Sequence, residues 1–285
     1  MKLGINNGIW EIKGINFEKA IPLIKDFGFN FVDVLALGSA NPTLLSSKDK
    51  VRISKEFQKK ELIASNMVTL PAGNISTSDD NEKEEYLSYV KACADFQAEL
   101  GGRQILLGRG CGQKTIDLSY EKAWINSVSF ISNICEYLMN LKMFLTLELD
   151  PSVYFMVNST YKMVNMIEDV GAPNLFANID IGHLAITRES PKKLKKLKNY
   201  IMHIHISDND GNKHENLIIG KGVALIKEYL KELMSLDIDK TSEAYGEKMV
   251  AALELGEIGQ KIDDINFYIK ESMNFISKNI PELSF

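Results

Sequence analysis

The sequence predicts an α/β protein built as a single (β/α)8 barrel, the TIM-barrel fold. Eight short apolar runs recur along the 285 residues, and the segments between them carry apolar residues at helical spacing. Dividing the length by eight leaves about 36 residues per unit, enough for one strand, one helix and their loops. A doubly wound open sheet is the alternative, but the even distribution of the runs and the absence of an early GxGxxG motif favour the barrel.

The apolar runs are the expected strands, in chain order: residues 3–6, 29–37, 61–70, 103–108, 142–149, 175–182, 200–207 and 248–255. Between them the clearest helical patterns cover residues 17–28, 83–101 and 123–141, and the first two end in the glycine expected after a helix. The basic run 191–199 predicts a solvated helix face, with phosphate or nucleic-acid binding as the alternative. Because no linker or low-complexity tract divides the chain, we expect one domain over residues 1–285.

The composition excludes several classes of protein. Hydrophobic residues make up 45% of the chain and charged residues 25%, which is typical of a globular domain, and the formal net charge is −5. A net acidic chain is a poor candidate for binding nucleic acid. Cys93, Cys111 and Cys135 form no CxxC motif, which favours a reducing compartment. With no signal-peptide pattern and no run of about 20 apolar residues, we expect a cytoplasmic protein without a membrane partner; a homo-oligomer is left open.

Alternation along the strands predicts which side chains enter the barrel, because residues i and i+2 share a face. On the last four expected strands, one face is mixed and carries Phe144, Thr146 and Glu148; Phe176, Asn178 and Asp180; His203 and His205; and Val250, Ala252 and Glu254. The other face is aliphatic and includes Met202, Ile204 and Ile206. We expect the aliphatic face to pack against the helices and the mixed face to line the barrel.

The mixed face ends in a polar residue on each of these four strands: Glu148, Asp180, His205 and Glu254. Asn6 joins them from the first strand. Barrel enzymes build their sites at these C-terminal strand ends. Three buried carboxylates would repel one another unless a cation offsets their charge. The donor set suits one divalent ion, Mn²⁺, Mg²⁺ or Co²⁺ rather than structural Zn²⁺, although Zn²⁺ is an alternative. Taken singly, each glutamate could equally be a solvated charge at a strand end.

Further candidates lie near the same strand ends. All four histidines fall between His183 and His214. His214 is expected either to touch the substrate or to be a plain loop residue, and His203 to support the site or fill the core. Lys221, in a Gly-Lys-Gly loop, and Arg109, in a Gly-Arg-Gly loop, are candidates for holding a phosphate. Trp10 and Phe31 are expected to form an apolar wall for a sugar, and Trp10 could equally pack in the core.

Several motifs occur in strand order along the chain: LGIN (3–6), GFNFVDVLA (28–36), ELDP (148–151), NIDIGH (178–183), HIHISDNDG (203–211), HENLIIGKG (214–222) and LELG (253–256). Together they resemble the sugar phosphate isomerase/epimerase superfamily of xylose isomerase-like TIM barrels, which includes ketose 3-epimerases. The resemblance implies that Glu148, Asp180, His205 and Glu254 hold the metal and that His183 faces the substrate. It also implies that Glu148 and Glu254 move the proton on opposite faces of the sugar.

The expected function is therefore a divalent-metal-dependent isomerase or epimerase of a sugar or sugar phosphate, acting through a metal-stabilised enediolate. The substrate contacts expected are Asn6, Trp10, His183, His214 and Lys221. The alternatives are a keto-inositol dehydratase or isomerase, a sugar-binding barrel without turnover, and an endonuclease-like phosphodiesterase.

Two departures from the superfamily narrow this expectation. Ketose 3-epimerases usually carry an arginine six residues after the metal histidine, and this chain has Gly211 there. The related apurinic endonucleases hold three zinc ions with additional histidines on the third and fourth strands. Residues 69–74 and 106–112 contain no histidine, so one metal site is expected.

Overall fold

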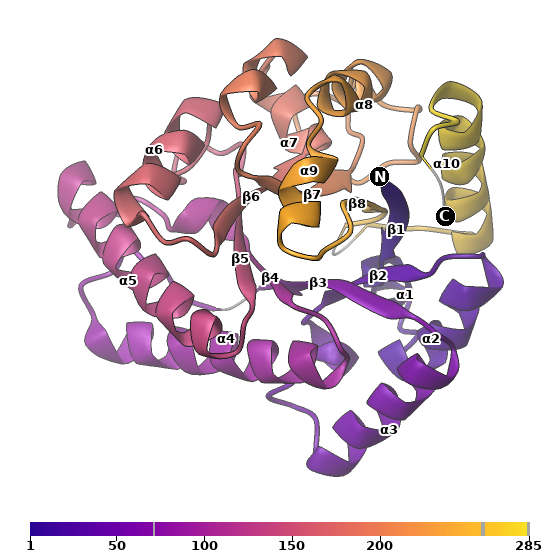
Figure 1. The fold of residues 1–285 in the computed structure, drawn as a ribbon, viewed down its shortest axis with the longest axis horizontal. Coiled ribbons are helices and arrows are strands. Elements are labelled where there is room, and N and C mark those ends of the chain that lie inside the picture. Colours follow the sequence, from indigo (N-terminus) through magenta and orange to yellow (C-terminus); the bar gives the residue numbers. More distant parts are fainter. Residues whose placement is uncertain (71, 258–259, 284–285) are drawn as a thin grey trace.

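The computed structural model describes residues 1–70, 72–257 and 260–283. Its strands are all parallel and close into a barrel in sequence order, with β1 paired to β8 (Figure 1). The strands are β1 (Lys2–Asn6), β2 (Phe31–Leu35), β3 (Ile63–Thr69), β4 (Gln104–Leu107), β5 (Phe144–Glu148), β6 (Leu175–Asp180), β7 (Ile201–Ile206) and β8 (Val250–Leu253). Seven of them lie within the expected runs and β1 begins one residue before its run, at Lys2, which confirms the predicted (β/α)8 barrel.

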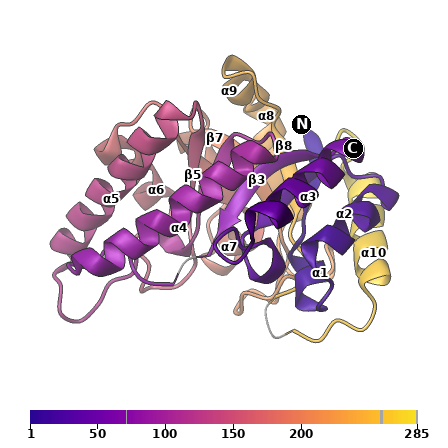
Figure 2. The same ribbon diagram turned by 90° about the horizontal axis from the view of Figure 1, so that it is seen from below.

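Helices surround the strands on the outside of the barrel (Figure 1). They are α1 (Gly8–Ile12), α2 (Phe17–Asp26), α3 (Ser47–Lys59), α4 (Asp80–Glu99), α5 (Tyr120–Asn140), α6 (Thr160–Val170), α7 (Ile181–Ile186), α8 (Ile226–Ser235), α9 (Asp239–Ala244) and α10 (Ile265–Asn279). Figure 2 shows the short helices α1 and α7 at one end of the barrel and α9 at the other. Because α1 and α7 directly follow β1 and β6, their end is the C-terminal mouth.

Local sequence explains where the helices begin and end. The Ser46 side chain accepts a hydrogen bond from the Asp49 amide while Asp49 bonds back to the Ser46 backbone, so a capping box starts α3. The Asp79 side chain caps α4 by accepting hydrogen bonds from the amides of Asn81 and Glu82, and α6 ends at Gly171 in the left-handed conformation. The basic run contains a 3-10 helix (Pro191–Lys196) whose lysines are exposed.

The interior of the barrel is apolar at the end opposite the mouth. Here the structure corrects the expected position of Met202. Met202 packs with Phe144 and Phe176 inside the barrel, not outside with Ile204 and Ile206. The reason is a register shift between β6 and β7, which pairs Ala177 with Ile201 but Asn178 with His203. The shift brings Met202 inward along with the histidine that follows it. Tyr245, which follows α9, covers the apolar end of the barrel. Its ring centroid lies 5.3 Å from that of Phe144 and 5.1 Å from that of Phe176.

The outward-facing aliphatic residues of the strands belong to one large core that also includes residues of the helices. Above the apolar layer the barrel interior becomes polar. Asp33, Asn66, Thr146, Asn178 and His203 are all buried there. The interior of the barrel therefore becomes polar toward its C-terminal mouth.

Two further features bear on earlier expectations. The three cysteines are free and buried. Among the helices of the described residues, none is both long and apolar enough to cross a membrane.

Candidate metal centre at the barrel mouth

The four expected ligands come together at the mouth of the barrel. The Nδ1 atom of His205 lies 3.0 Å from an Oε atom of Glu148, 3.0 Å from an Oε atom of Glu254 and 4.0 Å from Oδ2 of Asp180. Strands β5, β6 and β7 supply three of these side chains, and Glu254 directly follows β8. Alternation along the strands produces this convergence, since each residue is the last barrel-facing position before its loop.

The charges in this cluster are not balanced by the protein. Burial alone would lower the pKa of His205, but the carboxylates of Glu254 and Glu148 hold it well above its ordinary value. Burial raises the pKa of Glu254, and the attraction of His205 offsets only part of this effect. The raised pKa values of His205 and Glu254 both indicate an excess of negative charge in the cluster. A proton on His205 relieves part of this excess. A divalent cation would relieve it more completely.

The donor atoms fit a metal ion by their spacing and by their lack of other partners. In an octahedral site with bonds of about 2.1 Å, neighbouring donors lie about 3 Å apart and opposite donors about 4 Å apart. Oδ2 of Asp180 and Nδ1 of His205 are buried and have no hydrogen-bond partner outside the cluster. One ligand atom from each of Glu148, Asp180 and His205 lies within 4.8 Å of the other two. The set of three carboxylates and one imidazole therefore suits a divalent cation.

Neighbouring side chains hold the carboxylates in place. The amide of Asn178 donates to Oε1 of Glu148 at 2.5 Å. Oδ1 of Asp180 accepts from the backbone N–H of His183 at 2.8 Å and from the Ser207 hydroxyl at 2.7 Å. Asp180 thus uses one oxygen to cap α7 and leaves the other directed at the cluster.

Behind His205 lies a carboxylate that the sequence analysis did not single out. Oδ2 of Asp33, on β2, is 3.1 Å from Nε2 of His205 and 2.7 Å from Nε2 of His203, and the Ser65 hydroxyl donates to its Oδ1 at 2.6 Å. Burial would raise the pKa of Asp33, but the charge and hydrogen bond of His203, together with those of His205, hold it well below its usual value. A lone charged residue inside the apolar run 29–37 was the available signal.

The rings of His183 and His214 lie in contact at the mouth, with their centroids 4.4 Å apart and their planes tilted by 53°. Nδ1 of His183 is 2.7 Å from the Leu149 carbonyl, so it donates there, and Nε2 is left without a partner. Nδ1 of His214 lies 3.1 Å from the Glu257 carboxylate. Burial would lower the pKa of His214, but the bond with Glu257 and nearby carboxylates raise it to about 10. Glu257 is a second residue that the sequence analysis missed.

Of the other expected contacts, Asn6 lines the mouth cavity, whereas Trp10, Phe31 and Lys221 do not. Asn6 is at the mouth, where its Oδ1 accepts from the Gly8 amide and its Nδ2 has no partner. Trp10 is 1% exposed and packs in the core beside Phe27. Phe31 is buried and is not part of the mouth cavity lining. Lys221 is exposed and likewise lies outside that lining.

The Gly-Lys-Gly loop around Lys221 has its backbone donors already engaged. Asp208, fully buried, accepts from the amides of Gly220 and Gly222, each at 2.9 Å, as well as from Asn209 and Ala224. A side chain at Gly222 would meet Asp208 at 2.2 Å, which explains the glycine. This carboxylate occupies the place that a phosphate would need at those two amides, so we do not assign a phosphate to this loop.

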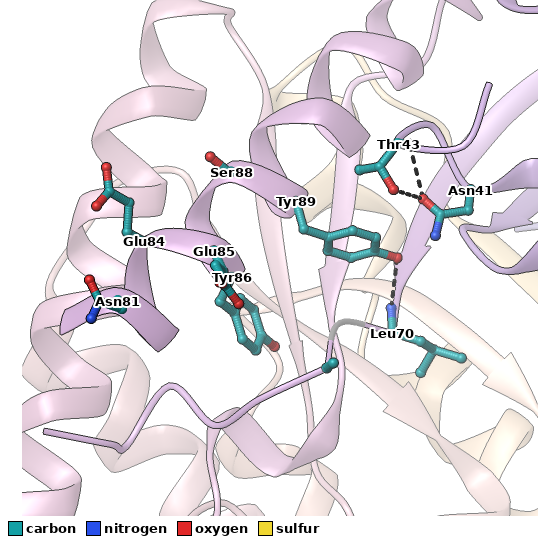
Figure 3. Close-up of a pocket in the computed structure, with 10 residues that line it drawn as sticks. Asn41, Thr43, Leu70, Asn81, Glu84, Glu85, Tyr86, Ser88 and Tyr89 are labelled. Atoms are coloured by element: carbon teal, nitrogen blue, oxygen red, sulfur yellow. Dashed lines mark hydrogen bonds between the residues drawn. The ribbon is translucent and has the colours of Figure 1, made fainter. Parts of the chain in front are cut away.

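A cavity of about 240 Å³ lies above the cluster. One wall is polar and includes Glu148, His183, His214 and Glu254, and the opposite wall is apolar and includes Leu35, Val68 and Leu70. Arg109 also lines it, in a left-handed backbone conformation. Leu70 is shared with an open groove of about 990 Å³ beside α4 (Figure 3), where the Tyr89 hydroxyl bonds to the Leu70 amide. A small polyol with one apolar side matches the two walls of the cavity.

The chain is similar to proteins of known sequence and to a described protein family. The family model described as "Xylose isomerase-like TIM barrel" matches residues 21–244. A fructoselysine 3-epimerase of Escherichia coli O157:H7 is 29% identical over 212 residues, covering 73% of this chain and 72% of the relative. A protein of Methanocaldococcus jannaschii without an assigned function is 26% identical over 247 residues, covering 85% of this chain and 92% of the relative.

Solved structures agree on the fold. The crystal structure of a D-tagatose 3-epimerase-like protein superposes with a TM-score of 0.82 at 18% identity, covering 99% of this chain and 98% of the other. At this level of identity, the similarity shows a shared barrel.

Proposed function

The chain belongs to the xylose isomerase-like TIM barrel family, and on that basis we propose that it is a divalent-metal-dependent isomerase or epimerase of a small sugar. The single observation that carries the proposal is the convergence of three carboxylates on the Nδ1 atom of His205, at the mouth of the barrel. The curated relative named as a fructoselysine 3-epimerase supports the same class of reaction.

In this proposal Glu148, Asp180, His205 and Glu254 hold the metal. When bound, a divalent cation would stabilise negative charge that develops on a substrate oxygen next to the reacting carbon. Mn²⁺, Mg²⁺ and Co²⁺ fit the donor set best, with Zn²⁺ as the next candidate. The unpartnered Nε2 of His183 accepts a hydrogen bond from a substrate hydroxyl, and Asn6 donates one from its Nδ2.

Glu148 and Glu254 move the proton. They reach His205 from β5 and from the end of β8, so they flank the space above it from two sides. One carboxylate removes the proton from the carbon beside the carbonyl, and the other returns a proton to the opposite face. Asn178 holds Glu148 by its Oε1 and fixes its orientation. A raised pKa lets Glu254 carry a proton more readily than an ordinary glutamate does.

We test the proposal by incubating the metal-loaded protein with ketoses in deuterated water. The expected result is deuterium at the carbon next to the carbonyl, together with an epimeric or isomeric sugar. Product that has lost water would instead identify a dehydratase acting on a keto-inositol type of substrate. Metal binding without deuterium incorporation into any sugar would contradict catalysis and favour a sugar-binding barrel.

We also propose that residues 1–285 form one domain, because the barrel runs from β1 to β8 and α10 packs against its core. The free, buried cysteines are consistent with a reducing compartment such as the cytoplasm.

A further inference from the structure

We infer that Asp33 is a positioning residue that fixes the tautomer and orientation of His205, so that its Nδ1 atom is presented to the metal. The inference rests on the proposed function, because it concerns the same metal centre. Asp33 lies on β2, far along the chain from His205 on β7, and it does not approach the mouth cavity itself. Its effect is therefore transmitted through the imidazole ring.

The first step is the protonation of the ring. Asp33 is completely buried, and two imidazoles and one hydroxyl surround its carboxylate. A carboxylate with three such partners accepts hydrogen bonds from all of them. Nε2 of His205 must then carry the hydrogen that points to Oδ2 of Asp33. In a neutral imidazole this leaves the lone pair on Nδ1, the atom that faces Glu148 and Glu254.

The second step is the orientation of Asp33. A single hydrogen bond would allow the carboxylate to rotate, but Ser65 holds Oδ1 and His203 holds Oδ2. His203 therefore helps to hold Asp33 through its Nε2 atom. Its Nδ1 atom has no hydrogen-bond partner. Its ring stands perpendicular to that of His205, 5.6 Å away. Two imidazoles on one carboxylate oxygen leave little freedom for either ring.

The third step is the local backbone. The register between β2 and β3 shifts at Val32/Asp33, and the register between β6 and β7 shifts at Ala177/Asn178, next to His203. Such irregularities redirect side chains and are frequent beside active sites. Here they occur on the two strand pairs that carry Asp33 and His203. The fold therefore departs from a regular barrel at the place where the carboxylate and the imidazoles meet.

The experiment measures the dissociation constant of Co²⁺ by titration calorimetry on chelator-treated protein, together with the melting temperature of the metal-free protein. Asp33→Asn keeps the shape of the side chain but removes its charge and one acceptor. We expect this variant to bind Co²⁺ about 10–100-fold more weakly, the usual cost of losing a group that orients a ligating histidine. His203→Gln, which leaves the bond between Asp33 and His205 in place, should weaken binding less.

Ser54→Ala is the matched control, because it removes the hydrogen bond from the Ser54 hydroxyl on α3 to the Glu99 carbonyl at the end of α4, and neither residue lines the mouth cavity. It should lower the melting temperature and leave the dissociation constant unchanged. If Asp33→Asn behaves like this control, Asp33 is merely structural and the inference is wrong. If Asp33→Asn abolishes binding while Glu254→Ala retains it, the metal lies between Asp33 and the two histidines, which also overturns the inference. Failure of the wild type to bind any of Co²⁺, Mn²⁺, Mg²⁺ and Zn²⁺ would instead overturn the proposed function, and the inference with it.

Discussion

Glu254→Gln is expected to lower the rate of proton exchange at the substrate carbon by about 10²–10⁴-fold, the usual contribution of a positioned acid or base. Glutamine keeps the size of the side chain and one oxygen donor, but it cannot accept and return a proton. Glu148→Gln should have an effect of the same order, since the two carboxylates act on opposite faces of the carbon. Deuterium incorporation from solvent, followed by NMR, measures both variants.

The control for these two variants must separate proton transfer from metal loss. Bound metal is therefore quantified in each protein, and rates are compared at metal saturation. Glu121→Gln, at the exposed start of α5, provides a glutamate substitution away from the mouth and should exchange protons like the wild type. Full turnover by Glu148→Gln and Glu254→Gln at metal saturation would remove both residues from the mechanism.

The second large effect is expected on stability. Asp208→Ala should lower the free energy of unfolding by about 3 kcal/mol or more, because an unpaired buried donor costs about 1–3 kcal/mol and Asp208 accepts from four backbone amides. The substitution would also loosen the loop that carries His214. Urea unfolding followed by circular dichroism measures the difference.

Asp210→Ala is the matched control for Asp208. Asp210 also accepts from two backbone amides, those of Asn212 and Lys213, but it is exposed and water can replace it. The free energy of unfolding of Asp210→Ala should be close to that of the wild type. Equal loss of stability in both variants would show that the loop is not organised by Asp208.

Much of the fold could be predicted because barrel strands repeat a simple physical pattern. Each strand needs an aliphatic outer face for the helices, and this face is visible in runs such as 142–149 and 248–255. The same alternation indicates Glu148 and Glu254 as neighbours at the mouth. Met202 was placed wrongly because alternation assumes regular pairing, and the register shift in β7 breaks it.

The network around Asp33 could not be predicted from local pattern. Its partner His203 is 170 residues away in the sequence, and their contact depends on how β2 and β7 face each other across the closed barrel. The same limit applies to Trp10, for which the sequence allows both a sugar-facing and a packed position. The structure selects the packed position, since the Trp10 side chain is almost fully enclosed beside Phe27.

The most direct test of the central claim, that four residues at the mouth hold a divalent cation, is thermal unfolding of chelator-treated protein with and without Mn²⁺. At about 100 times its dissociation constant, the ion should add about 2.7 kcal/mol to the stability of the wild type. Glu254→Ala should abolish the shift, while Glu121→Ala should keep it. No shift of the wild type with Mn²⁺, Mg²⁺, Co²⁺ or Zn²⁺, or an undiminished shift in Glu254→Ala, would contradict the account.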